Sequence, residues 1–323
     1  MTHRVAAAIV IYHPDPEVIV SLIYGIAPDV QLIQLFLNSA LPTAFINSCI
    51  TAAGFTAVRI LGNGRNVGLG RAYNEAARHA RESGCDLLLL LDQDSTFAPG
   101  MAARLTSLLD RARGGASKGI IAIGPRPTRP ESGIAYKLPP IAPNSLRLPS
   151  HSTETCFIIS SGSIISIDAM MAVGRFREDF FIDCIDIEWW FRARALGFSC
   201  IMALNEYMPH RLGRGLIRVP FLNITLIDQP PERLYTYARN QIAMMRLRHV
   251  PSGWKLRAIL ALALRILITV PVYRRSIETK ALLRGIIAGL RSEIGAPPPL
   301  SAVTDSPTRT TEGRCRSAMR ADS

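Results

Sequence analysis

The stretch LLLLLDQDS, which spans residues 87–95, decides the fold class of this chain. Five consecutive leucines predict a short strand that is buried on both faces, as in the centre of a parallel sheet. Asp92 and Asp94 follow at the carboxyl end of this strand. Because ligands of open parallel sheets bind beyond the carboxyl ends of the strands, these two aspartates are candidate ligand-binding residues.

The segments around this strand alternate between two periodicities. Short apolar runs predict strands at Val5–Tyr12, Gln31–Leu37, Val58–Leu61 and Ile120–Gly124. Helical periodicity is found at Leu69–Glu82, Pro99–Arg113 and Asp186–Leu196. The alternation predicts an α/β fold with a mixed, mostly parallel sheet that is flanked by helices.

The basic charge of the chain is concentrated towards its C-terminal end. Residues 1–232 contain 21 basic and 20 acidic side chains, whereas the remaining residues up to 323 contain 16 and 5. The second part also has helical periodicity with separate basic and apolar faces. We therefore predict an α/β domain over residues 1–232, a basic amphipathic helical extension over residues 233–295 and a disordered tail over residues 296–323.

In the helical extension, Lys and Arg alternate with Leu and Ile rather than with aromatic residues that could stack on bases. This pattern favours an anionic membrane surface as a partner and disfavours a nucleic acid. The alternative is that the extension packs on the core with its basic face in water. The sequence has no run of about 20 apolar residues, which a spanning helix would need. Six cysteines without a C-x-x-C pair indicate a reducing compartment, so we expect a cytoplasmic protein that is peripheral on the inner face of the cell membrane.

The carboxylates of Asp92 and Asp94 are costly to hold side by side unless a cation neutralises them. Hard divalent cations take one or two carboxylates together with substrate phosphates. The pair therefore predicts a site for Mg²⁺ or Mn²⁺ against a phosphate group. The alternative is that Asp94 or Ser95 caps the helix that follows.

A second acidic stretch, FIDCIDIEWWFR, spans residues 181–192. A carboxylate among aromatic residues at a helix start can have its pKa moved towards neutrality, which suits a general base that takes a proton from a hydroxyl. Asp186 is the candidate for this role, and the alternative is a helix N-cap. Glu188 and Arg192 are four residues apart, so they can pair on one helix face.

The glycines of residues 62–70 do not follow the spacing of the dinucleotide-binding fingerprint. Asn66 and Gly68 precede a predicted helix, so they belong either to a nucleotide-binding loop or to an ordinary turn. His210 follows a predicted strand, and a lone histidine in such a place is more often structural than functional.

Taken together, these residues resemble the inverting family 2 glycosyltransferases with a GT-A fold, and among them the bacterial rhamnosyltransferases. The resemblance covers about residues 4–250 and rests on motifs in a fixed order. These are IYHPD at residues 11–15, NVGLG at 66–70, DQDS at 92–95, SGS at 161–163, FIDxxDxEW at 181–189 and His210.

The resemblance implies a role for each matching residue. It places the nucleotide of a nucleotide-diphospho-sugar donor on Tyr12, His13, Asn66, Gly68 and Asp92. It places Mg²⁺ or Mn²⁺ on Asp94 and His210, and it makes Asp186 the general base. It places the acceptor at Ser161, Gly162, Glu188 and Trp189.

The implied reaction moves a sugar to a glycan or lipid-linked acceptor with inversion, and L-rhamnose from dTDP-L-rhamnose is the expected donor group. The sequence departs from the family at Leu37, where an aspartate usually contacts the nucleoside, and at His13, where asparagine is usual. Leu37 motivates the alternative of a catalytically weakened, glycosyltransferase-like binding or scaffold protein. A nucleotidyltransferase is a further alternative, but its basic glycine-rich loop is absent because HPDP follows the first strand.

Overall fold

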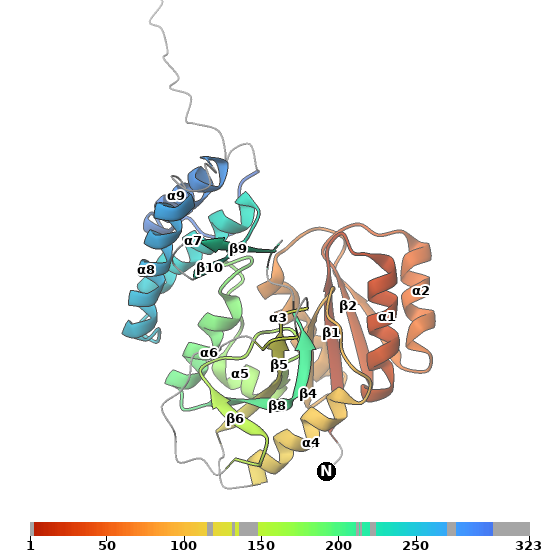
Figure 1. The fold of residues 1–323 in the computed structure, drawn as a ribbon. Helices are drawn as coiled ribbons and strands as arrows, with labels where there is room; N and C mark the ends of the chain where they lie inside the picture. Colours follow the sequence, from red (N-terminus) through yellow and green to blue (C-terminus); the bar gives the residue numbers. More distant parts are fainter. Residues whose placement is uncertain are drawn as a thin grey trace, which may run out of the picture.

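The computed structural model describes residues 3–114, 119–130, 133–135, 148–210, 213, 215–219, 224–269 and 276–299. It shows a central sheet with helices on both faces and a group of helices to one side (Figure 1). The predicted tail falls largely outside the described residues, since residues 300–323 are not among them.

Eight strands form the main sheet in the order β3-β2-β1-β4-β7-β5-β8-β6. Their bounds are β1 Val5–Ile11, β2 Leu32–Leu37, β3 Ala57–Leu61, β4 Leu87–Asp92, β5 Ile120–Thr128, β6 Ser152–Thr155, β7 Ile164–Ser166 and β8 Ser199–Pro209. The first four strands are parallel, β5 is parallel to β8, and β6 and β7 run antiparallel to their neighbours. The predicted α/β class and mixed, mostly parallel sheet are confirmed.

The leucine run is apolar throughout because both of its faces are covered. Leu88 and Leu90 pack into a core with α3 (Leu69–Glu82), α5 (Ile167–Val173) and α6 (Ile185–Ala195). Leu87, Leu89 and Leu91 pack into a second core with α1 (Pro16–Ile26), α2 (Thr43–Ala53) and α4 (Met101–Gly114). A short 3₁₀ turn, Ala27–Asp29, follows α1. The period-2 alternation of a strand thus divides one run of leucines between two cores.

After the sheet, β9 (Gly215–Val219) and β10 (Ile224–Asp228) form an antiparallel pair. The helical extension follows as α7 (Pro231–Met245), α8 (Ser252–Thr269) and α9 (Ser276–Leu290). Leu234 and Ala238 of α7 pack against Leu262 of α8 and Leu282 of α9. None of the described helices is long and apolar enough to cross a membrane.

Glu188 of α6 connects the α/β domain to the segment after α7. Its carboxylate is 1% exposed, pairs with Arg192 at 3.0 Å and lies 2.8 Å from Nε2 of His249. Trp254 at the start of α8 packs edge-on against Phe191 of α6. The extension is therefore joined to the domain through buried polar and aromatic contacts.

Two loops meet where α3 begins. Gly68 has a φ of 84°, and a Cβ at this position would lie 2.7 Å from the carbonyl oxygen of Phe181. The backbone N–H of Leu69 donates to that same oxygen at 2.7 Å. Glycine is required here both by the left-handed backbone and by the close approach of the loop that precedes α6.

Gly68→Ala tests this contact. We expect the free energy of unfolding, measured by urea denaturation, to fall by about 1–2 kcal/mol more than in Gly84→Ala. Gly84 is the matched control because its φ is 73° and a Cβ there would meet no atom within 4 Å. Equal losses in the two variants would show that the approach of the two loops contributes nothing to stability.

Glu188→Ala tests the connection between the domain and the extension. Removing one partner of a buried charge pair leaves the other uncompensated, so we expect a loss of about 3 kcal/mol in the free energy of unfolding. In the control Glu82→Ala, an exposed helical pair with Arg78 is removed, and the loss should stay below about 0.5 kcal/mol. A loss at Glu188 as small as that at Glu82 would contradict the structural role.

Candidate active site

The carboxyl end of β4 carries the two aspartates on a set of hydrogen-bonded hydroxyl groups. Asp92 is the last residue of β4 and is partly buried, whereas Asp94 is exposed in the loop beyond it. The hydroxyl of Ser161 accepts from the backbone N–H of Asp92 at 3.3 Å and lies 2.5 Å from the hydroxyl of Ser95. The hydroxyl of Tyr73 donates to the Asp92 carboxylate at 3.4 Å.

Burial and the nearby charge of Asp94 raise the pKa of Asp92 to about 6. The charge of Arg233 and the hydrogen bond from Tyr73 oppose this rise. The two aspartates therefore repel each other beside an apolar core, and a cation bound between them would relieve this repulsion.

Asp186 lies in the first turn of α6, where backbone N–H groups point at its side chain. The N–H of Ile187 donates to it at 2.9 Å and the N–H of Ser160 at 3.3 Å. Burial raises the pKa of Asp186, and these two backbone hydrogen bonds oppose the rise. The charge of Asp92 raises it further, so the two carboxylates are within electrostatic reach of each other. A raised pKa in a fixed carboxylate is what a general base needs.

His210 joins the same group of residues from the end of β8. Its backbone N–H donates to the carbonyl of Thr128 at 2.9 Å. Burial lowers the pKa of His210, and the charges of Asp94 and Asp186 act against this. His210 is thus within electrostatic reach of Asp94, the other predicted metal residue, and of Asp186, the predicted base.

The donor atoms of this group suit a divalent cation, since Mg²⁺ and Mn²⁺ take carboxylate oxygens and Mn²⁺ also accepts imidazole. Within the described part of the chain, no three His, Cys, Asp or Glu side chains stand close enough to form a complete metal site.

Tyr12 and His13 follow β1, next to the end of β4. The side chain of Gln93 holds this segment, because it accepts from the N–H of Tyr12 at 2.7 Å and donates to its carbonyl at 3.0 Å. The N–H of His13 donates to the hydroxyl of Ser39 at 2.9 Å, and His13 has a left-handed φ of 47°. The side chain of Tyr12 is 48% exposed and is free to contact a ligand.

The loop between β3 and α3 lies over the end of β2. The N–H of Gly64 donates to the carbonyl of Leu37, and the N–H of Val67 donates to the side chain of Asn38 at 3.2 Å. Asn66 caps the N–H of Gly68 at 3.1 Å. The side chain of Leu37 is 8% exposed and packs in the core.

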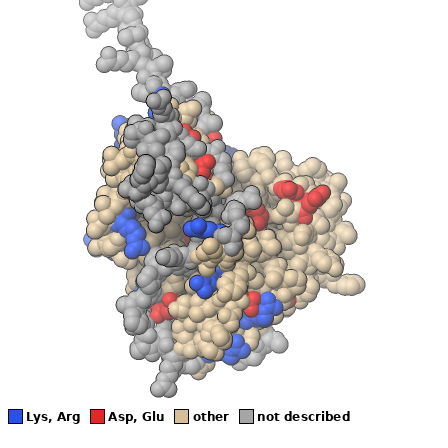
Figure 2. Space-filling view, in the orientation of Figure 1, with Lys and Arg blue, Asp and Glu red and all other residues tan. Residues whose placement is uncertain are grey.

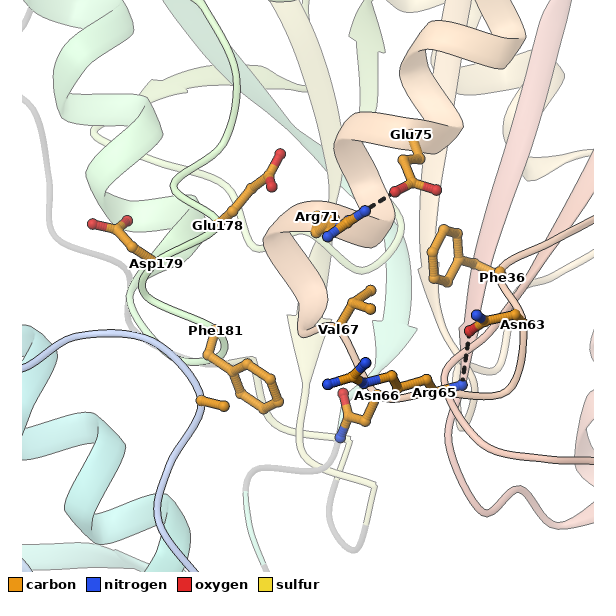
Figure 3. Close-up of a pocket in the computed structure, with 12 residues that line it drawn as sticks. Phe36, Asn63, Arg65, Asn66, Val67, Arg71, Glu75, Glu178, Asp179 and Phe181 are labelled. Carbon is orange, nitrogen blue, oxygen red and sulfur yellow. Dashed lines mark hydrogen bonds and ion pairs between the residues drawn. The ribbon is translucent and has the colours of Figure 1, made fainter.

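A pocket of about 720 Å³ opens beside this loop (Figure 3). It lies between the loop, the start of α3 and the segment before α6, and its lining includes Asn66, Arg65 and Phe181. Arg71 and Glu75 pair with each other on the α3 side. Of the residues predicted to bind the nucleotide-sugar donor, Asn66 lines this pocket.

The four residues predicted to bind the acceptor are buried in the structure. Ser161 and Glu188 are 1% exposed and Trp189 is fully buried. A Cβ at Gly162, which is buried too, would lie 2.7 Å from Sδ of Met208. Glu188 and Trp189 lie on the buried side of α6, whereas Ser161 and Gly162 precede β7; the motif spacing alone does not show which face of a helix is covered. Ser161 supports Asp92, and Glu188 and Trp189 hold α6 in the core.

Sequence reasoning missed two residues at the site. Tyr73 lies on the buried face of α3 and was indistinguishable from an ordinary core aromatic residue. Arg233 lies in the extension, and its guanidinium pairs with Asp183 at 2.6 Å while its charge also reaches Asp92. The extension contains many basic residues, so the sequence pattern did not distinguish Arg233 from those on the surface.

Comparison with known proteins relates the chain to glycosyltransferases. Residues 43–174 match the sequence model of glycosyl transferase family 2. The chain is 26% identical over 245 residues to the dTDP-rhamnosyl transferase RfbF of Shigella flexneri. The aligned region covers 74% of this chain and 80% of that protein.

Solved structures share the fold at low sequence identity. The mannosyltransferase PcManGT from Pyrobaculum calidifontis, in complex with GDP-Man and Mn²⁺, matches with a TM-score of 0.55 and 12% identity over 91% of this chain and 88% of that one. Residues 1–349 of S. aureus TarS, in complex with UDP, match with a TM-score of 0.51 and 10% identity over 93% and 83% of the two chains. The comparisons thus show that residues 43–174 resemble glycosyl transferase family 2 and that the chain shares its fold with solved glycosyltransferases.

Proposed function

We propose that this enzyme transfers L-rhamnose from dTDP-L-rhamnose to a hydroxyl of a glycan or lipid-linked acceptor, with inversion at the anomeric carbon. The observation that carries the proposal is the similarity to a dTDP-rhamnosyl transferase over 80% of that protein's length. The arrangement of Asp92, Asp94, Asp186 and His210 at one edge of the sheet supports it.

In the proposed reaction, Asp186 takes the proton from the acceptor hydroxyl as the new bond to the anomeric carbon forms. The bond from that carbon to the diphosphate breaks on the opposite side, and dTDP leaves. The raised pKa of Asp186 makes it a better proton acceptor than an exposed carboxylate, while its two backbone donors keep it oriented.

The donor diphosphate would lie beyond β4, against Asp92, with Tyr12, His13, Asn66 and Gly68 on the nucleoside side. Asp94 and His210 would hold Mg²⁺ or Mn²⁺. When bound, the cation neutralises charge on the leaving diphosphate. Mn²⁺ is present in the structures of two similar folds, the mannosyltransferase above and GalNAc-T7, which supports a divalent cation.

We also propose that the enzyme works at an anionic membrane surface. Apolar side chains of α8 recur at helical spacing on its exposed side, and Leu256, Leu260 and Leu267 are 59%, 60% and 68% exposed. The exposed side of α9 repeats this with Leu283 and Ile287, which are 43% and 47% exposed. The opposite sides of both helices pack on α7, so the extension covers the core with one side and presents leucine and isoleucine with the other.

Basic side chains accompany these apolar strips. Arg257 and Lys280 are exposed on α8 and α9, and the face drawn in Figure 2 has Lys and Arg side chains at the left, with Asp and Glu side chains nearer the top of the same part. Apolar burial at the headgroup boundary and attraction of cations to acidic lipids act together in interfacial helices. A lipid-linked acceptor would be presented at the same surface.

The donor site is tested by calorimetric titration of dTDP, UDP, GDP and ADP, each with Mn²⁺ and with EDTA. We expect dTDP to bind most tightly and Asp94→Ala to weaken it about 10-fold or more, because one cation ligand is lost. Asp186→Asn should bind dTDP like the wild type and slow transfer about 100-fold or more, as expected for a lost general base. Preference for UDP or GDP would contradict the assigned donor, and no binding at all would favour the scaffold alternative.

The membrane surface is tested by co-flotation with vesicles of phosphatidylcholine alone or with a quarter of phosphatidylglycerol. We expect binding to the anionic vesicles, and an approximately 10-fold or greater loss when Leu256, Leu260 and Leu267 are changed to Ser. The matched control changes Tyr24 and Phe55 to Ser, because these side chains are 76% and 110% exposed on the α/β domain. Unbound wild-type protein, or an equal loss in the control, would overturn this part of the proposal.

A further inference from the structure

The segment that carries Asp186 is held in an unfavourable backbone conformation. Phe181, Asp183 and Cys184 all have a left-handed φ, of 64°, 66° and 61°. Each such residue costs about 1 kcal/mol or more, and the conformation persists only where the surroundings fix it. Cys184 is also the N-cap of α6 and makes no side-chain capping hydrogen bond. Something outside this segment must therefore hold it.

Asn240 of α7 provides the first of these restraints. Its side chain is fully buried, and its Nδ2 donates to the carbonyl oxygens of Phe180 at 3.0 Å, Ile182 at 2.7 Å and Asp183 at 2.9 Å. Nε of Arg239 donates to Oδ1 of Asn240 at 3.1 Å, which orients the amide. One side chain thus receives three carbonyl groups that the left-handed turns leave without partners in helix or sheet.

The second restraint acts on the side chain of Asp183. Arg233 approaches this carboxylate through Nε and Nη2, the closest contact being 2.6 Å, and the hydroxyl of Thr236 donates to it at 2.7 Å. Arg233, Thr236 and Asn240 lie three and four residues apart, so they share one face of α7. That face is directed at the segment before α6.

We propose that Asn240 is a positioning residue, which fixes residues 180–184 so that the carboxylate of Asp186 is held at the reacting centre. The inference rests on the proposed role of Asp186 and extends it to the helical extension, which then forms part of the catalytic unit. Without the amide donors, the carbonyl groups of Ile182 and Asp183 lose this partner, while that of Phe180 keeps Nη2 of Arg239 at 3.0 Å, and the left-handed turns relax. The base is then displaced, whereas Asp92 is also supported by Tyr73 and Ser161 and the loop of Asn66 is also held by Asn38, besides its contact with Phe181.

The test uses Asn240→Asp, which keeps the shape and the acceptor for Arg239 but removes the amide donors. Gln241→Glu is the matched control, because it makes the same chemical change at the next residue of α7, which is also buried. Three quantities are measured on the full chain: amide hydrogen exchange of residues 181–188, the Kd for dTDP, and release of dTDP from dTDP-L-rhamnose with water as the acceptor. The rate is also measured with Asp186→Asn alone and combined with Asn240→Asp.

We expect Asn240→Asp to speed exchange in residues 181–188 about 10-fold and to slow dTDP release about 10- to 100-fold. The Kd for dTDP should change by less than about 3-fold, and Gln241→Glu should leave exchange and rate near wild type. In the Asp186→Asn background, Asn240→Asp should add less than about 2-fold, because the two changes act on the same group. If Asn240→Asp does not fold, Thr236→Val replaces it and should give the same pattern with smaller changes.

Unchanged exchange in residues 181–188 would overturn the inference, and so would an undiminished slowing in the Asp186→Asn background. Equal slowing in Gln241→Glu would show a general effect of charge on α7 and would also overturn it. If Asp186→Asn alone releases dTDP at the wild-type rate, the proposed base is wrong. Faster exchange in Asn240→Asp would then still show that α7 holds the segment, so the two failures are distinguishable.

Discussion

The repulsion between Asp92 and Asp94 at the end of a fully buried strand is the constraint around which the site is organised. Burial and this repulsion together raise the pKa of Asp92 to about 6. Two neighbouring groups oppose this rise, since the hydroxyl of Tyr73 and the charge of Arg233 both stabilise the Asp92 carboxylate. Ser161 holds the backbone at the same point and Gln93 ties it to β1. The arrangement is costly in the free protein, and the proposed cation and diphosphate would relieve this cost.

The sequence could predict those parts of the fold that depend on local pattern. The leucine run required a strand with two covered faces, and each face has its own core. The two acidic motifs could be located because carboxylates at strand and helix ends are unusual beside apolar runs. The order of the motifs along the chain then indicated a GT-A fold.

The roles of Ser161 and Glu188 could not be predicted in the same way. Both follow motif positions, but whether such a side chain faces a ligand or the core depends on the elements that cover it. Glu188 is covered because His249, 61 residues later in the chain, returns to pair with it. Asn240 is a similar case, since its three acceptors lie about 60 residues earlier and a single amide on a helix has no local signature. Contacts of this kind require the folded chain.

The helical extension has three surfaces with different chemistry, and this explains why its sequence pattern was ambiguous. One face of α7 is polar and buried against the segment before α6, the inner sides of α8 and α9 are apolar and packed, and their outer sides are apolar and exposed. Packing against the core and contact with an apolar surface both favour leucine and isoleucine. A helix that is apolar on two sides therefore has no clear division into an apolar and a polar face in its sequence. Packing on the core is found on one side of these helices, and the proposed contact with a membrane would use the other side. Through α7, the side that is proposed to hold the base and the sides that are proposed to meet a lipid surface belong to one packed unit.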